Sequence, residues 1–167
     1  MQSVEFEEKQ TAKGMILIVQ SILILITTTI LTVVVIIPYL SRGRLNSSAL
    51  GVAGLALGAG VLVWLLFRYM TLRTIITSDY IAVQYKPFQF SPVKIKCSDI
   101  ESYEVRTYEP LMEYGGWGLR YSLINGKAYN ISGNIGLQLY LQNGKKILIG
   151  TEQPEAIERV MQKVLGF

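Results

Sequence analysis

Residues 15–37 read MILIVQSILILITTTILTVVVII, and no charged residue occurs between Lys13 and Arg42. A helix needs about 20 predominantly apolar residues to cross the hydrocarbon core of a bilayer, which is about 30 Å thick. The run therefore predicts a transmembrane helix over 15–40. A cleaved signal peptide is the competing interpretation, but its apolar region is usually about 7–15 residues long and ends at small residues. Residues 36–40, IIPYL, do not form such a cleavage site.

Residues 49–67 read ALGVAGLALGAGVLVWLLF and form a second uncharged run, between Arg44 and Arg68. This run predicts a second transmembrane helix over 49–70. The loop that joins the two helices, 41–48, is short. The helices are therefore expected to form an antiparallel hairpin with both chain termini on one side of the membrane.

Small residues predict where the two helices meet. Gly54 and Gly58 are four residues apart, a spacing that lets a neighbouring helix approach closely. Thr28 and Thr32 are the expected partners on the first helix, because their hydroxyl groups can bond to either helix. The alternative is that glycine is simply more frequent in membrane helices.

Positive charges near the two runs predict the orientation. They are more numerous beside the termini than in the loop: Lys9, Lys13, Arg68 and Arg73 against Arg42 and Arg44. Cytoplasmic segments carry an excess of Lys and Arg. The expected location is the inner (cell) membrane, crossed twice, with both termini in the cytoplasm.

From about residue 72 the long apolar runs give way to alternating ones, whereas residues 1–14 read as a tail. Strands are expected over 73–78, 80–85, 93–97, 101–108, 119–124, 127–132, 135–141 and 145–150. Asn-Gly pairs at 125–126 and 143–144 predict hairpin turns. Residues 154–165 have apolar side chains at helical spacing. The predicted fold class is an α+β membrane protein, in which the helical hairpin precedes an antiparallel β-barrel or sandwich over 72–167, capped by the C-terminal helix.

The composition argues against catalysis. Histidine is absent and Cys97 is the only cysteine, so the commonest general base and the usual zinc ligands are missing. No nucleophile motif or phosphate loop occurs. We therefore expect no catalytic residue, no metal, no cofactor and no enzyme activity. The nearly balanced charge of residues 72–167 also argues against nucleic acid as a partner.

The segment 109–118, EPLMEYGGWG, is the strongest candidate for a contact site. Large apolar side chains in a glycine-rich loop often contact a partner or a membrane. The candidate contact residues are Leu111, Met112, Tyr114, Trp117 and the following Arg120. The alternative for Trp117 is that its side chain packs under the rim of the barrel.

Arg120 has two interpretations. It could bind an anionic group together with Arg106, or it could form a structural ion pair with Glu109 or Glu113. The structural pair is the favoured interpretation.

Four stretches in this order resemble the bacterial pleckstrin-homology-like membrane proteins that carry two N-terminal transmembrane helices. They are TSDYIAVQY (77–85), SDIESYEV (98–105), GGWGLR (115–120) and GKKILIGTEQPEAIERVM (144–161). The resemblance implies a bent antiparallel barrel plugged by the terminal helix. It implies no catalytic residues, and no basic cluster for phosphoinositides is evident.

The expected function is a membrane-anchored, non-catalytic interaction module that binds a protein or peptide at the membrane surface. One alternative is an oligomeric assembly, structural or pore-like, built from the hairpins. A further alternative is binding of anionic lipid by the β domain. The expected partners are the lipid bilayer and a second copy or another membrane protein; the sequence identifies no small-molecule ligand.

Overall fold

The computed structural model describes residues 3–12, 14–41 and 47–166. The chain divides into two compact units. One is a helical unit, Ala12–Tyr69, and the other combines Met1–Thr11 with Met70–Phe167. The helical unit is thus inserted in the sequence between two parts of the second unit.

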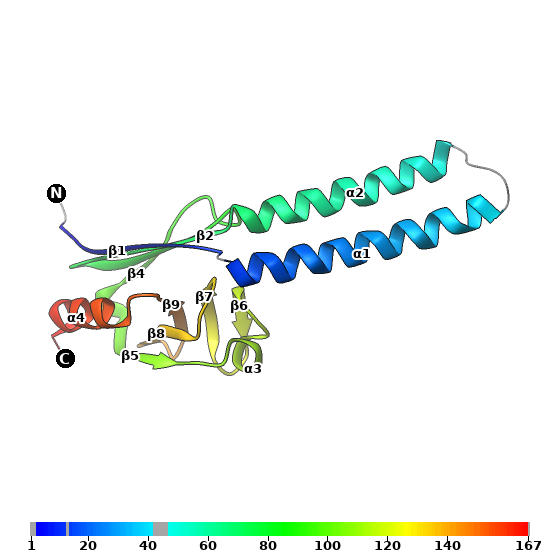
Figure 1. Cartoon of the computed structure of the whole chain (residues 1–167). Helices are drawn as coiled ribbons and strands as arrows, with labels where there is room; N and C mark the ends of the chain where they lie inside the picture. The colour runs from blue at the N-terminus through cyan, green and yellow to red at the C-terminus, as the bar shows by residue number, and fades with distance from the viewer. Residues whose placement is uncertain (1–2, 13, 42–46, 167) are drawn as a thin grey trace. The chain divides into compact units, whose positions relative to one another are not determined.

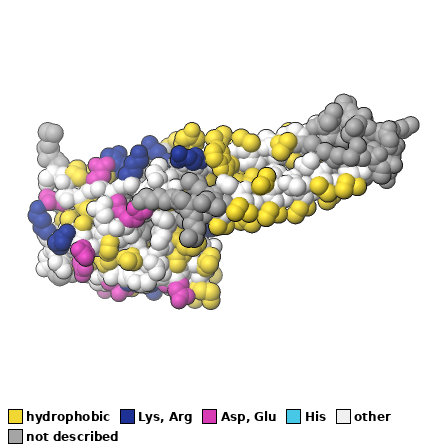
Figure 2. Space-filling view, viewed as in Figure 1, with side chains coloured by type: hydrophobic (Ala, Val, Ile, Leu, Met, Phe, Trp, Pro, Cys, Tyr) yellow, Lys and Arg dark blue, Asp and Glu magenta, His cyan; other side chains and the backbone are white. Residues whose placement is uncertain are grey.

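The helical unit is an antiparallel pair of helices, α1 (Gly14–Ser41) and α2 (Ser47–Arg68), which run side by side (Figure 1). The bounds of the two helices are close to those predicted. Most of the predicted loop, 41–48, lies outside the described residues. Trp64 Nε1 donates a hydrogen bond to Ser21 Oγ at 3.0 Å and so joins the two helices. Aliphatic side chains cover much of the visible face of the pair (Figure 2).

The prediction that these helices cross a membrane is contradicted. Judged over the described part of the chain, no helix combines the length and the apolar character that a bilayer crossing requires. The predicted inner-membrane location and cytoplasmic orientation depended on such helices and are corrected with them.

The first sheet has the strand order β1-β2-β3-β4 and is antiparallel throughout. Its strands are β1 (Val4–Thr11), β2 (Thr71–Thr77), β3 (Tyr80–Lys86) and β4 (Val93–Lys96). β1 comes from the segment that the sequence analysis interpreted as a tail. It pairs with β2 along its length, from Val4 opposite Thr77 to Thr11 opposite Thr71. Residues on the two sides of the helical insertion therefore meet in one ladder.

The second sheet has the order β5-β8-β9-β7-β6. Its strands are β5 (Ile100–Thr107), β8 (Ile135–Leu141), β9 (Lys146–Gly150), β7 (Gly126–Asn130) and β6 (Gly118–Ser122). The 3-10 turn Cys97–Asp99 connects it to the first sheet. β9 lies between β8 and β7 and pairs with β7 in parallel.

The predicted pleckstrin-homology-like antiparallel barrel is therefore wrong. The described strands form two separate sheets, of four and five strands, and one pair is parallel. The reason is the β8–β9 hairpin. Because β8 pairs with the distant β5, its hairpin partner β9 is left to meet β7 running in the same direction. The chain is α+β, and nothing in its described residues supports an oligomer built from hairpins.

The second sheet is buried on both faces at its centre. Ala128 pairs with Leu148, and the two cluster with Tyr108 and Tyr114. The next pair, Tyr129 and Ile149, points to the opposite face because side chains alternate along a strand. All of these side chains are buried. Burial on both faces explains why β7 and β9 are apolar at their centres.

The terminal helix α4 (Pro154–Leu165) confirms the predicted helix over 154–165. Ile157 and Met161, one turn apart, are fully buried, and the helix packs against β1, β5 and β8. Pro154 stands in the first turn, where its missing N–H costs no hydrogen bond. Gly166 ends the helix in the left-handed conformation at φ 72°.

Candidate functional site

The candidate segment 109–118 forms a short helix, α3 (Pro110–Tyr114), followed by a glycine turn. Its apolar side chains divide into two groups. Leu111 and Met112 are exposed, whereas Tyr114 is buried and packs edge to face on Tyr108 with ring centroids 6.1 Å apart. Of these three, only Leu111 and Met112 are available for a contact, and Tyr114 anchors the helix.

Trp117 and Arg120 are fixed by hydrogen bonds to the backbone. Trp117 Nε1 donates to the carbonyl oxygen of Gly133 at 2.8 Å, and about a third of the residue is exposed. Arg120 Nε donates to the carbonyl oxygen of Trp117 at 3.0 Å. These hydrogen bonds give both side chains a structural role in the loop. For Trp117, this role is similar to the alternative prediction, in which its side chain packs within the fold.

The structural ion pair expected for Arg120 is formed by Arg106 instead. Its Nη2 lies 2.6 Å from Glu113 Oε2, and its Nη1 donates to Glu113 Oε1 at 3.1 Å. The bond to Arg106 lowers the pKa of the Glu113 carboxyl group. Arg106 also donates to Gln138 Oε1 at 3.0 Å. The guanidinium group of Arg106 is therefore already bound to other side chains of the fold. These contacts do not support an anion site shared by Arg106 and Arg120.

The surface that the sequence analysis missed is the turn between β6 and β7. The exposed fractions of its apolar residues are 93% for Leu123, 80% for Ile124 and 73% for Tyr121. Turns usually carry Gly, Pro, Asn, Asp or Ser. Two large aliphatic residues in succession at 123–124, beside the predicted Asn-Gly turn, were the signal in the sequence that could have identified this surface.

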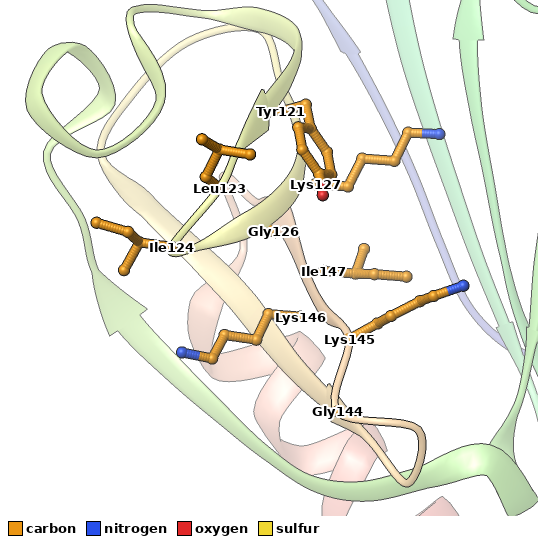
Figure 3. A pocket seen from close by; sticks show the side chains of 9 residues that line it. All are labelled: Tyr121, Leu123, Ile124, Gly126, Lys127, Gly144, Lys145, Lys146 and Ile147. Atoms are coloured by element: carbon orange, nitrogen blue, oxygen red, sulfur yellow. The ribbon is translucent and has the colours of Figure 1, made fainter.

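A hollow of about 480 Å³ lies beside this turn. It is formed where the β6–β7 turn meets the β8–β9 turn, and Tyr121, Gly126 and Ile147 line its centre (Figure 3). We call it the turn hollow. Gly126 makes the close approach possible: its φ is +76°, and a Cβ built there would lie 2.2 Å from the carbonyl oxygen of Lys146. A residue with a Cβ would not fit there, so glycine lets the first residues of β7 and β9 approach in this way.

The lining of the turn hollow is positively charged. Lys127, Lys145 and Lys146 contribute to it, and no acidic residue does. Lys127, in β7, and Lys145, which precedes β9, extend toward the same side, whereas Lys146 extends to the other side (Figure 3). Lys127 Nζ lies 4.9 Å from the ring centroid of Tyr129. The ion pairs found within the described residues involve none of these three lysines.

The hollow lies next to an open sheet edge. β6 is the last strand of its sheet and pairs only with β7 among the described strands. In an antiparallel pair, alternate residues direct their N–H and C=O groups away from the partner. Such an edge can pair with an added strand.

Of the residues predicted for helix packing, the structure places Thr28, but neither Gly54 nor Gly58, where the two helices approach closely. A Cβ built at Gly54 or Gly58 would meet no described atom within 4 Å. The close approach occurs instead at Gly60, where a Cβ would lie 2.8 Å from Thr28 Cγ2. Thr32 Oγ1 donates to the carbonyl oxygen of Thr28 at 2.7 Å, within its own helix.

The described residues offer little for a cofactor or metal. Across 3–12, 14–41 and 47–166, no group of three or more histidine, cysteine, aspartate or glutamate side chains is placed to hold a metal ion. Cys97 is partly buried, and burial, with a smaller effect of the nearby Asp79, raises the pKa of its thiol. A raised pKa makes the thiol a weaker nucleophile at neutral pH.

Comparison with known proteins does not assign the chain to a family. No protein-family profile matches it, and no curated protein is significantly similar to it. The resemblance to pleckstrin-homology-like membrane proteins is therefore corrected, since it also required two membrane-spanning helices and a single barrel.

Proposed function

We propose that the sheet-containing unit is a non-catalytic module that binds a segment of another protein at the β6–β7 turn. The observation that carries the proposal is the exposure of three large apolar side chains, Tyr121, Leu123 and Ile124, in one short stretch. Binding surfaces concentrate their energy in a few large side chains, with aromatic residues enriched among them. Exposed aliphatic groups in one place also gain most from being covered.

Two further features support this location. The adjacent turn hollow is concave and can receive a side chain of the partner. The open edge of β6 can add main-chain hydrogen bonds to an extended segment. A strand added at this edge would bring its side chains beside the exposed turn.

The test is selection of peptides from a random display library against the full chain. Selected peptides are expected to lose at least tenfold in affinity for a chain carrying Leu123→Ser and Ile124→Ser. The matched control is Phe90→Ser. Phe90 is 96% exposed, but it lies in the loop between β3 and β4 of the first sheet. The control should bind as the unmodified chain does. Equal binding by all three chains would exclude the turn as the binding surface.

A further inference from the structure

We infer that the segment bound at the β6–β7 turn is acidic and carries an aliphatic side chain for the turn hollow. This inference rests on the proposed function and adds the chemistry of the partner. The inference is based on the lining of the turn hollow, where apolar and cationic side chains share one concave surface. The exposure of the turn alone does not show this combination.

The lysines of the turn hollow form no ion pair with a carboxylate among the described residues. Three lysines line it, no carboxylate does, and no ion pair of the described residues engages Lys127, Lys145 or Lys146. Two of them, Lys127 and Lys145, extend toward the same side (Figure 3). Cationic groups placed together repel one another, so a carboxylate set between them relieves that repulsion and gains from both.

The apolar part of the hollow lies between the same lysines. Ile147 pairs with Lys127 in the parallel ladder, and Tyr121 pairs with Lys127 across the β6–β7 hairpin. An aliphatic side chain of the partner would cover Ile147 and Tyr121, while neighbouring carboxylates would meet the ammonium groups. A purely ionic partner would leave these apolar groups exposed, and a purely apolar one would desolvate the lysines without compensation.

The concave shape favours a peptide over a bilayer surface. A hollow of about 480 Å³ receives a protruding side chain, whereas a lipid surface is contacted mainly by groups that protrude from the protein. The open edge of β6 next to the hollow is also suited to an extended chain, which has its own N–H and C=O groups to pair.

The experiment uses the full chain and three short synthetic peptides that share their leucine positions. The other positions hold glutamate, glutamine or lysine. The glutamate peptide is expected to bind roughly tenfold or more tightly than the glutamine peptide at low salt, and to weaken as salt is raised. The lysine peptide is expected not to bind. Equal binding of the glutamate and glutamine peptides would overturn the inference and leave the proposed function intact.

Two double variants test which lysines bind the glutamate peptide. Lys127→Ala combined with Lys145→Ala should weaken binding of the glutamate peptide about tenfold or more. Lys94→Ala combined with Lys96→Ala removes the same charge from β4 and should leave binding within about twofold. Equal losses in both double variants would show a response to net charge alone and overturn the inference.

Two further measurements separate the remaining possibilities. Hydrogen exchange of the β6 and turn amides should slow when the glutamate peptide binds. If none of the peptides binds and none protects these amides, the inference and the proposed function both fail. Vesicles of zwitterionic lipid with and without anionic lipid are the last probe. If the anionic vesicles bind the chain through Lys127 and Lys145 more tightly than the glutamate peptide does, a lipid surface replaces the acidic peptide.

Discussion

Glu8 Oε2 accepts a hydrogen bond from Thr151 Oγ1 at 2.7 Å, although 143 residues separate the two in sequence. The other carboxylate oxygen, Oε1, accepts the backbone N–H of Glu152 at 2.7 Å. Glu8 lies in β1 of the first sheet and is only 4% exposed, while Thr151 follows β9 of the second sheet. One buried carboxylate therefore joins the two sheets at the start of the segment that leads into α4.

Replacing Glu8 with alanine should destabilise the sheet unit. The change leaves the Thr151 hydroxyl and the Glu152 N–H without this acceptor in a buried place, which costs about 1–3 kcal/mol of unfolding free energy. Glu7→Ala is the control, because Glu7 pairs with Arg73 where both side chains are about half exposed. Such a pair contributes less than about 1 kcal/mol. Urea unfolding of the full chain measures both, and a larger loss for Glu7→Ala would contradict the role of Glu8.

Gly126 and Gly144 form a matched pair for testing the contact between the two turns. Both have φ +76°, but a Cβ at Gly126 would lie 2.2 Å from the Lys146 carbonyl oxygen, whereas one at Gly144 would meet nothing within 4 Å. Gly144→Ala should cost about 1–2 kcal/mol of backbone strain. Gly126→Ala should cost at least about 1–3 kcal/mol more, because the starts of β7 and β9 must separate. Thermal melts of the two variants compare these costs, and equal shifts would show that Gly126 and Lys146 are not in close contact.

The Glu113 carboxylate should make stability depend on pH. Its hydrogen bonds to Arg106 lower the pKa of the carboxyl group below 4.5, its ordinary value. A lowered pKa in the folded state stabilises the fold above the unfolded pKa, and this contribution is lost as the pH falls through the folded pKa. Glu113→Gln should therefore be less stable than the unmodified chain at pH 7, and the difference should shrink below about pH 4.

Urea unfolding at several pH values measures this difference. Glu101→Gln, on an exposed position of β5, removes the same charge and should change the unfolding free energy at pH 7 by less than about 0.5 kcal/mol. A difference between Glu113→Gln and the unmodified chain that stays constant from pH 7 to pH 3 would contradict the ionic role of Glu113.

The helix pair offers a test at Gly58 and Gly60. Alanine is favoured over glycine inside a helix by about 1 kcal/mol, so Gly58→Ala, which meets no described atom within 4 Å, should stabilise α2. Gly60→Ala should lose that gain, because its Cβ would lie 2.8 Å from Thr28 Cγ2. Fluorescence of Trp64 in a Trp117→Phe background follows unfolding of the pair. A stabilising Gly60→Ala would show that α1 and α2 are not in close contact there.

Local patterns in the sequence determined much of the secondary structure. The apolar runs predicted the lengths of α1 and α2, the alternating runs predicted most strands, and the apolar spacing over 154–165 predicted α4. The Asn-Gly pairs predicted both hairpin turns, and both glycines adopt positive φ. These features depend on interactions between residues close in sequence, so a pattern of a few residues is sufficient to specify them.

Tertiary structure alone decided which strands pair and which surface stays open. β1 pairs with β2 across the whole helical insertion, and β9 inserts between β8 and β7, because burial rewards contacts between residues far apart in sequence. The same contacts bury Tyr114, one of the expected contact residues, and leave Leu123 and Ile124 exposed. The turn hollow likewise exists only where two turns, distant in sequence, are brought together at Gly126. Alternation places a side chain on one face of a strand, but whether that face is covered depends on the partner that packs there.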